Sequence, residues 1–148
     1  MRVAATTVIR ATPDQVWSFI TVLENGPRWQ ESAVWTRVVT PGPIGLGSAA
    51  EHEGRWLGMR IQTSGEVVIF ERPVRFGYTI RSKVSPTPVV MRYEIEPHDE
   101  GSRLTLSNQG ELSRWLRPFD RLLQQNVQGM FERDVARLKA VIEADLAS

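Results

Sequence analysis

Few side chains in this sequence are of the types that commonly take part in catalysis. The 148 residues include no cysteine, two histidines and two tyrosines. His52 lies in the stretch AAEHEG between Glu51 and Glu53, and a strand would turn it to the face opposite both carboxylates. An inward His52 could act as a general acid or base, because its ordinary pKa is near neutrality. The exposed face is the more common place for a strand histidine, and we expect His52 there.

Tyr78 and Tyr93 are the other candidate acid–base groups. Tyr78 falls on the apolar face of the alternating stretch 74–81, and Tyr93 falls on the apolar face of 89–97. A buried phenol needs a hydrogen-bond partner for its hydroxyl, and a bound ligand can supply one. Together with an inward His52, these two tyrosines are the candidate catalytic residues.

Other chemistries have little support in the sequence. His98 lies in the turn PHDEG, far along the chain from His52, and cysteine is absent, so we expect no metal site and no cofactor. The stretch GPIGLG (42–47) is followed by a strand instead of a helix, which argues against a phosphate-binding loop. We expect it to connect two strands and to border a cavity entrance. No serine has the G-x-S-x-G context of a hydrolase nucleophile.

The charge balance and the apolar runs limit the partners. The 18 basic and 17 acidic residues give a net charge of +1, so we expect no nucleic-acid binding. The N-terminal stretch lacks the apolar core of a signal peptide, and no apolar run approaches the ~20 residues that span a bilayer. We therefore expect a cytoplasmic protein without stable membrane insertion. The basic, amphipathic stretch LSRWLRPFDRLL (112–123) suggests membrane contact, although the simpler interpretation is one end of a long helix with a solvated outer face.

The first part of the chain predicts a strand and then a well-marked helix. The stretch 3–10 is rich in β-branched residues. Thr12 and Gln15 form the T-x-x-Q pattern of a capping box, with proline at the favoured first helical position between them. Apolar residues continue at helical spacing to Leu23, and Gly26–Pro27 is expected to end this helix. At most one more helical turn fits before the next strand.

The rest of the chain predicts six strands and then a long helix. The strand-like stretches are separated by short turns, which is typical of an antiparallel meander. They are 33–40, 48–54, 59–70, 74–81, 89–97 and 102–110. From Leu112 to Leu146, apolar residues recur every three to four positions, which predicts one long amphipathic helix. Pro118 either starts the main segment of this helix or kinks it one turn in.

A sheet with one apolar face and a helix with one apolar stripe can bury both if the sheet wraps the helix. The sequence therefore predicts a single α+β domain over residues 1–148. Its curved seven-stranded antiparallel sheet wraps a long C-terminal helix, and two short helices follow the first strand. This order, with I-x-A-x-P-x-x-V-W (9–17), L-E-N-x-P-R-W (23–29) and E-R-P-V-R-F (71–76), resembles the START-like, or SRPBCC, helix-grip superfamily. Within it, the polyketide cyclase/dehydrase-like branch is the most similar.

The resemblance implies a hydrophobic cavity between the sheet and the long helix. The candidate lining residues are Trp29, Phe76, Tyr78, Met91, Tyr93, Met130 and Phe131. Trp17 and Trp29 are implied to be scaffold near one end, beneath a lid made by the short helices. Each of these side chains could instead be an ordinary core residue without a ligand, because aromatic residues and methionines also fill protein cores.

Three functions remain open at this point. The leading one is binding of a small hydrophobic or aromatic molecule, polyketide-like or lipid-like, which predicts a mostly apolar wall with one or two polar anchors. A cofactor-free polyketide cyclase or dehydratase would bring two or more polar side chains together in the cavity. An interaction module without a small ligand would have a closed cavity and an exposed apolar patch. Both ligand-dependent functions call for a cavity of roughly 300 Å³ or more. A monomer and a homodimer are equally compatible with the sequence.

Overall fold

The computed structural model describes residues 1–82 and 87–148. The first four elements are β1 (Arg2–Ile9), α1 (Pro13–Ile20), the 3₁₀ helix η1 (Leu23–Asn25) and α2 (Gly26–Trp29). Six strands follow, namely β2 (Ala33–Val38), β3 (Ala49–Trp56), β4 (Met59–Glu71), β5 (Arg75–Arg81), β6 (Val89–His98) and β7 (Gly101–Gln109). The chain then forms the 3₁₀ helix η2 (Arg114–Phe119) and the long helix α3 (Asp120–Ala147).

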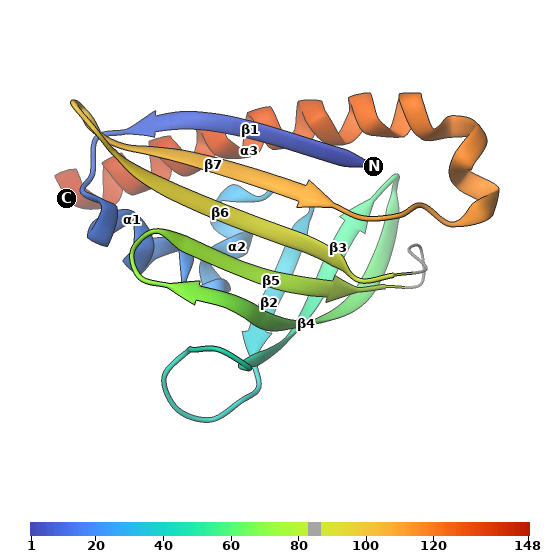
Figure 1. Cartoon of the computed structure of the whole chain (residues 1–148), viewed down its shortest axis with the longest axis horizontal. Coiled ribbons are helices and arrows are strands. Elements are labelled where there is room, and N and C mark those ends of the chain that lie inside the picture. Colours follow the sequence, from blue (N-terminus) through green and yellow to red (C-terminus); the bar gives the residue numbers. More distant parts are fainter. Residues whose placement is uncertain (83–86) are drawn as a thin grey trace.

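All seven strands form one antiparallel sheet in the order β1-β7-β6-β5-β4-β3-β2. Strands β2 to β7 are neighbours in chain order, as a meander requires, whereas β1 pairs with β7 at the far edge. Helix α3 runs along β1 and across the sheet, and α2 contacts α3 (Figure 1). The predicted α+β helix-grip fold is confirmed.

Alternation along the strands divides core from solvent as the sequence predicts. In β5, Phe76 and Tyr78 are buried while Arg75 and Arg81 are exposed. The neighbouring β6 buries Met91, Tyr93 and Ile95 on the same face. The buried side chains of α3 are Leu123, Val127, Phe131, Asp134, Val135, Leu138 and Ile142. This stripe meets the apolar face of the sheet, and the site lies between the two surfaces.

The first helix begins at its capping box but ends earlier than expected. The Thr12 hydroxyl accepts from the Gln15 backbone N–H at 3.2 Å, and the Gln15 side chain accepts from the Thr12 N–H at 2.9 Å. Helix α1 ends at Ile20, where the Thr21 hydroxyl donates back to the Trp17 carbonyl at 2.7 Å. The expectation that Gly26–Pro27 ends this helix is wrong. These two residues open α2, because proline suits the first turn of a helix.

The C-terminal helix also begins later than expected. Leu112 lies outside any helix, Pro118 lies inside η2, and α3 starts at Asp120. Proline lacks an N–H and its ring clashes with the carbonyl four residues earlier, so an α-helix does not continue through it. The prediction of one continuous helix from Leu112 is therefore wrong. Of the two possibilities for Pro118, the structure is closer to the first, because the long helix starts two residues after it.

Candidate functional site

A cavity of about 230 Å³ lies between the inner face of the sheet and α3. Its wall is mostly apolar and contains residues from each of the strands β2 to β7 and from α3. The exposed lining residues Arg55 and Glu111 mark the end that opens to solvent. A second hollow of about 330 Å³ adjoins it and shares Met1, Gly110 and Glu111.

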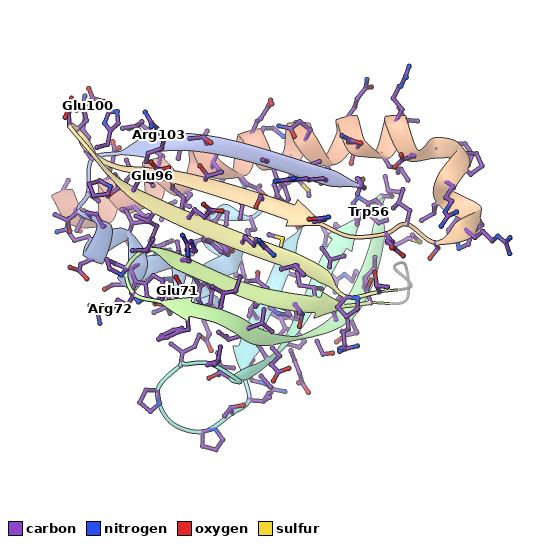
Figure 2. All side chains as sticks on the ribbon, viewed as in Figure 1. Trp56, Glu71, Arg72, Glu96, Glu100 and Arg103 are labelled. Atoms are coloured by element: carbon purple, nitrogen blue, oxygen red, sulfur yellow. The ribbon has the colours of Figure 1, made fainter. Side chains whose placement is uncertain are left out.

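The cavity is smaller than the roughly 300 Å³ that we expected for a ligand site, since pockets for drug-sized molecules measure about 300–1,000 Å³. The GPIGLG loop (42–47) contributes nothing to its lining, so the expectation that this loop borders the entrance is wrong. The loop joins β2 to β3 at the opposite end of β3 from Trp56, which does line the cavity (Figure 2).

His52 faces the cavity, so the expectation of an exposed histidine is wrong. Antiparallel pairing places it between Thr36 of β2 and Thr63 of β4. Its Nδ1 lies 3.0 Å from the Thr36 hydroxyl, and its ring stacks on Tyr78 with centroids 5.8 Å apart. Its Nε2 is buried and has no hydrogen-bond partner within the described part of the chain. Burial lowers the pKa of His52, and the ring is therefore neutral at pH 7.

Trp56 supplies a second buried nitrogen that lacks a partner among the described residues. Its Nε1 is buried like the Nε2 of His52, and both side chains line the cavity. They lie four positions apart on β3, which places them on one face with Cα atoms about 13 Å apart. The two side chains therefore line different parts of the same cavity.

Asp134 is a cavity residue that sequence reasoning missed. It is only 2% exposed, and one carboxylate oxygen accepts from the Glu31 N–H at 2.9 Å. Burial is the main reason that the pKa of Asp134 is raised to about 6. The sequence pattern does indicate that Asp134 is buried, because it interrupts the apolar stripe of α3, four positions after Met130 and four before Leu138.

The two tyrosines are buried as predicted, with different access to the cavity. Tyr78 lines it, whereas Tyr93 lines only a void of about 10 Å³ behind Tyr78 and His52. Burial raises the pKa of Tyr78, and polar contacts with Tyr93 and Gln30 oppose the rise. The pKa of Tyr93 is raised well above its usual value by burial, with Tyr78 and Asp134 adding to the rise. Both phenols are therefore protonated near neutral pH.

The predicted lining residues fall into two groups. Tyr78, Met91, Met130 and Phe131 line the cavity. Trp29 lines the small void instead and packs edge-on against Tyr93, with centroids 6.1 Å apart. Phe76 is fully buried, lines neither space, and packs against Trp17, Phe70, Tyr78 and Tyr93. A ligand-binding role for any of these side chains stays a prediction.

Metal ions and membranes are two other kinds of possible partner. No three His, Asp or Glu side chains gather as a metal site would need in residues 1–82 and 87–148. Within the same ranges, no helix combines the length and the apolar character that crossing a bilayer requires.

The comparisons with known proteins agree with this architecture. The family model described as "Polyketide cyclase / dehydrase and lipid transport" matches residues 1–143, whereas no curated protein matches the chain. The solved structure of TTHA0849 from Thermus thermophilus has a TM-score of 0.83 at 18% identity, covering 98% of this chain and 99% of its own. A START superfamily protein from Mycobacterium smegmatis has a TM-score of 0.79 at 14% identity, with 97% of each chain covered. The START-like helix-grip fold is thus shared, and the chain belongs to the polyketide cyclase/dehydrase and lipid transport family.

Proposed function

We propose that the chain binds a small, mostly apolar molecule in the cavity and anchors it by a hydrogen bond to Nε2 of His52. The observation that carries this proposal is a histidine side chain in an otherwise mostly apolar wall, whose buried Nε2 has no hydrogen-bond partner among the described residues. Leaving a buried polar atom without a partner costs about 1–3 kcal/mol. A polar atom of a ligand at this position would remove that cost.

The chemistry of Trp56, whose buried Nε1 also lacks a partner among the described residues, narrows the class of ligand. An indole N–H only donates, so Trp56 calls for an acceptor such as a carbonyl, ether or hydroxyl oxygen. His52 donates or accepts at Nε2 according to the tautomer that its bond to Thr36 selects. A cavity of about 230 Å³ favours a compact ring system over a long lipid chain. The proposed ligand is therefore a small cyclic molecule with at least one oxygen.

A cofactor-free cyclase or dehydratase is the second candidate, and one observation favours it. Asp134, with a pKa of about 6, and the neutral His52 line the same cavity. Groups that titrate near the operating pH are the effective general acids and bases. Tyr78 adds a protonated phenol in stacking contact with His52. This arrangement suits proton transfer to and from a carbonyl-containing substrate.

Native mass spectrometry of the gently purified chain tests the binding function. We expect a fraction of the chains to carry one small molecule, whose mass identifies its class. The variant His52→Phe keeps a ring to stack on Tyr78 but loses the anchor, so the occupied fraction should fall, with affinity reduced about tenfold. An unliganded mass in repeated wild-type preparations would count against the proposal.

The catalytic candidate is tested by incubating the recovered molecule with the chain and following its conversion. If the molecule is converted, His52→Ala and Tyr78→Phe should each slow conversion about 10²–10⁴-fold, the usual contribution of a general acid or base. Conversion that stays intact in both variants would exclude these catalytic assignments.

A further inference from the structure

Exposed apolar side chains lie on two separate segments, each of which follows residues that line the cavity. Trp115 is 67% exposed, and Phe119 and Leu122 are likewise exposed on η2 and the first turn of α3. Leu57 and Met59 are exposed at the tip of the β3–β4 hairpin. We call these five side chains, with the arginines beside them, the mouth surface.

Both segments border the same cavity. Arg55 and Trp56 of the hairpin line it, as do Glu111 and Leu112 just before η2. Figure 1 shows the hairpin and η2 at the end of the molecule where β7 leads into α3. On η2, Leu116 is buried whereas its neighbour Trp115 is exposed. The sequence favoured a solvated outer face for this basic amphipathic stretch, with membrane contact as the alternative, and the structure exposes Trp115 and Phe119 to solvent.

The tip of the β3–β4 hairpin holds Leu57 in an unfavourable backbone conformation. Trp56 pairs with Met59, which leaves a two-residue turn of Leu57 and Gly58 with φ of 52° and 78°. Positive φ at both positions is the type I′ turn, in which asparagine or glycine is strongly preferred at the first position. A leucine here is strained, and strain of this kind concentrates at functional positions.

Charge indicates what covers the mouth surface. The segments 53–60 and 111–122 contain five arginines (Arg55, Arg60, Arg114, Arg117 and Arg121) and three acidic residues, which leaves +2. The whole chain carries +1, so the remainder carries −1. Exposed tryptophan, phenylalanine and leucine flanked by arginine are the composition of a surface that lies in the interface of an anionic bilayer.

We propose that the mouth surface docks onto an anionic lipid bilayer, with Trp115, Phe119 and Leu57 entering the headgroup region and Arg114, Arg117 and Arg121 pairing with lipid phosphates. The cavity then opens toward the lipid. This inference concerns the outer surface and does not depend on whether the cavity holds a ligand. It involves no membrane-spanning segment.

The test is co-sedimentation of the full chain with vesicles of phosphatidylcholine alone and of phosphatidylcholine containing one third phosphatidylglycerol. We expect binding to the anionic vesicles, weakened by salt, and little binding to the neutral ones. Arg117→Gln should lower the partition coefficient about fivefold, the usual effect of one basic residue near an anionic surface. No sedimentation of the wild-type chain with anionic vesicles would overturn the proposal.

Leu57→Asn separates docking from folding. Asparagine suits the positive φ of Leu57, so this variant should melt at the same temperature as the wild type or higher, yet bind anionic vesicles several-fold less. The matched control is Leu46→Asn, which removes another highly exposed leucine from the loop that lines no part of the cavity. Equal loss of binding in both variants would overturn the proposal. So would a dimer, seen by analytical ultracentrifugation without lipid, that Leu57→Asn dissolves, because a second copy would then cover this surface.

Discussion

At the scale of single residues, the most informative feature is a carboxylate inside an apolar stripe. The pKa of Asp134 is raised from 3.8 to about 6, chiefly by burial and further by the charge of Glu31, while the hydrogen bond from the Glu31 N–H and the charges of Arg137 and Arg133 oppose the rise. The folded state therefore holds this proton more tightly than the unfolded chain does. Its contribution to stability is complete below about pH 4 and is lost as the pH rises to about 6.

Asp134→Asn should remove this loss, since asparagine keeps an oxygen to accept from the Glu31 N–H and carries no charge. We expect the free energy of unfolding in urea to rise by about 1–3 kcal/mol at pH 7 and to stay unchanged at pH 4. Glu132→Gln is the control, because Glu132 is exposed on the same helix. An equal gain at both pH values would show that the titration of Asp134 is not the cause.

The individual site residues could be predicted from the sequence only in part. Alternation alone indicates that Tyr78 and Met91 face inward, because period-two patterning fixes the face of a strand residue. The inward position of His52 depends on which face of β3 meets α3, and the polar neighbours of His52 in the sequence do not mark that face. Asp134 was recoverable from its place in the apolar stripe. Its hydrogen bond to Glu31 joins positions 103 apart in sequence, which no local pattern reveals.

At the scale of elements, the helix boundaries predicted best are those fixed by contacts between residues close in sequence. The capping box that starts α1 involves only Thr12 and Gln15, so four residues of sequence contain all the information. The end of the same helix was misplaced, because Gly26–Pro27 is equally suited to stop one helix and to begin another. The start of α3 was misplaced because the apolar period continues through η2, while the backbone around Pro118 does not remain α-helical.

Thr12→Ala should lower the free energy of unfolding by about 1 kcal/mol, because it removes the acceptor for the Gln15 N–H at the start of α1. Urea unfolding measures this loss directly. Gln15→Ala should cost less in the Thr12→Ala background than in the wild type, since both residues belong to one capping box. Strictly additive losses would indicate that the two bonds are independent.

At the scale of the whole molecule, the sheet and α3 leave a space that their own side chains do not fill. The succession of strands and the long helix along the chain was predictable because each element has a strong periodic pattern. The cavity volume of about 230 Å³ was not predictable, because it depends on how the side chains of six strands and one helix pack together. The same holds for the mouth surface, whose two segments are more than fifty residues apart in sequence.

Met130→Trp should fill part of this space, because Met130 lines the cavity from α3. We expect the variant to fold and to lose most of the small molecule that native mass spectrometry detects on the wild type. Gln125→Trp is the control, since it adds the same indole to an exposed position of α3. Unchanged occupancy in Met130→Trp would place the bound molecule outside the cavity.

A crystal structure of the chain purified without denaturation tests the binding function most directly. We predict electron density for a small non-protein molecule between β3 and α3, with one of its polar atoms about 3 Å from Nε2 of His52. A cavity closed by protein side chains, or one that holds only water hydrogen-bonded to that nitrogen, would contradict the binding function.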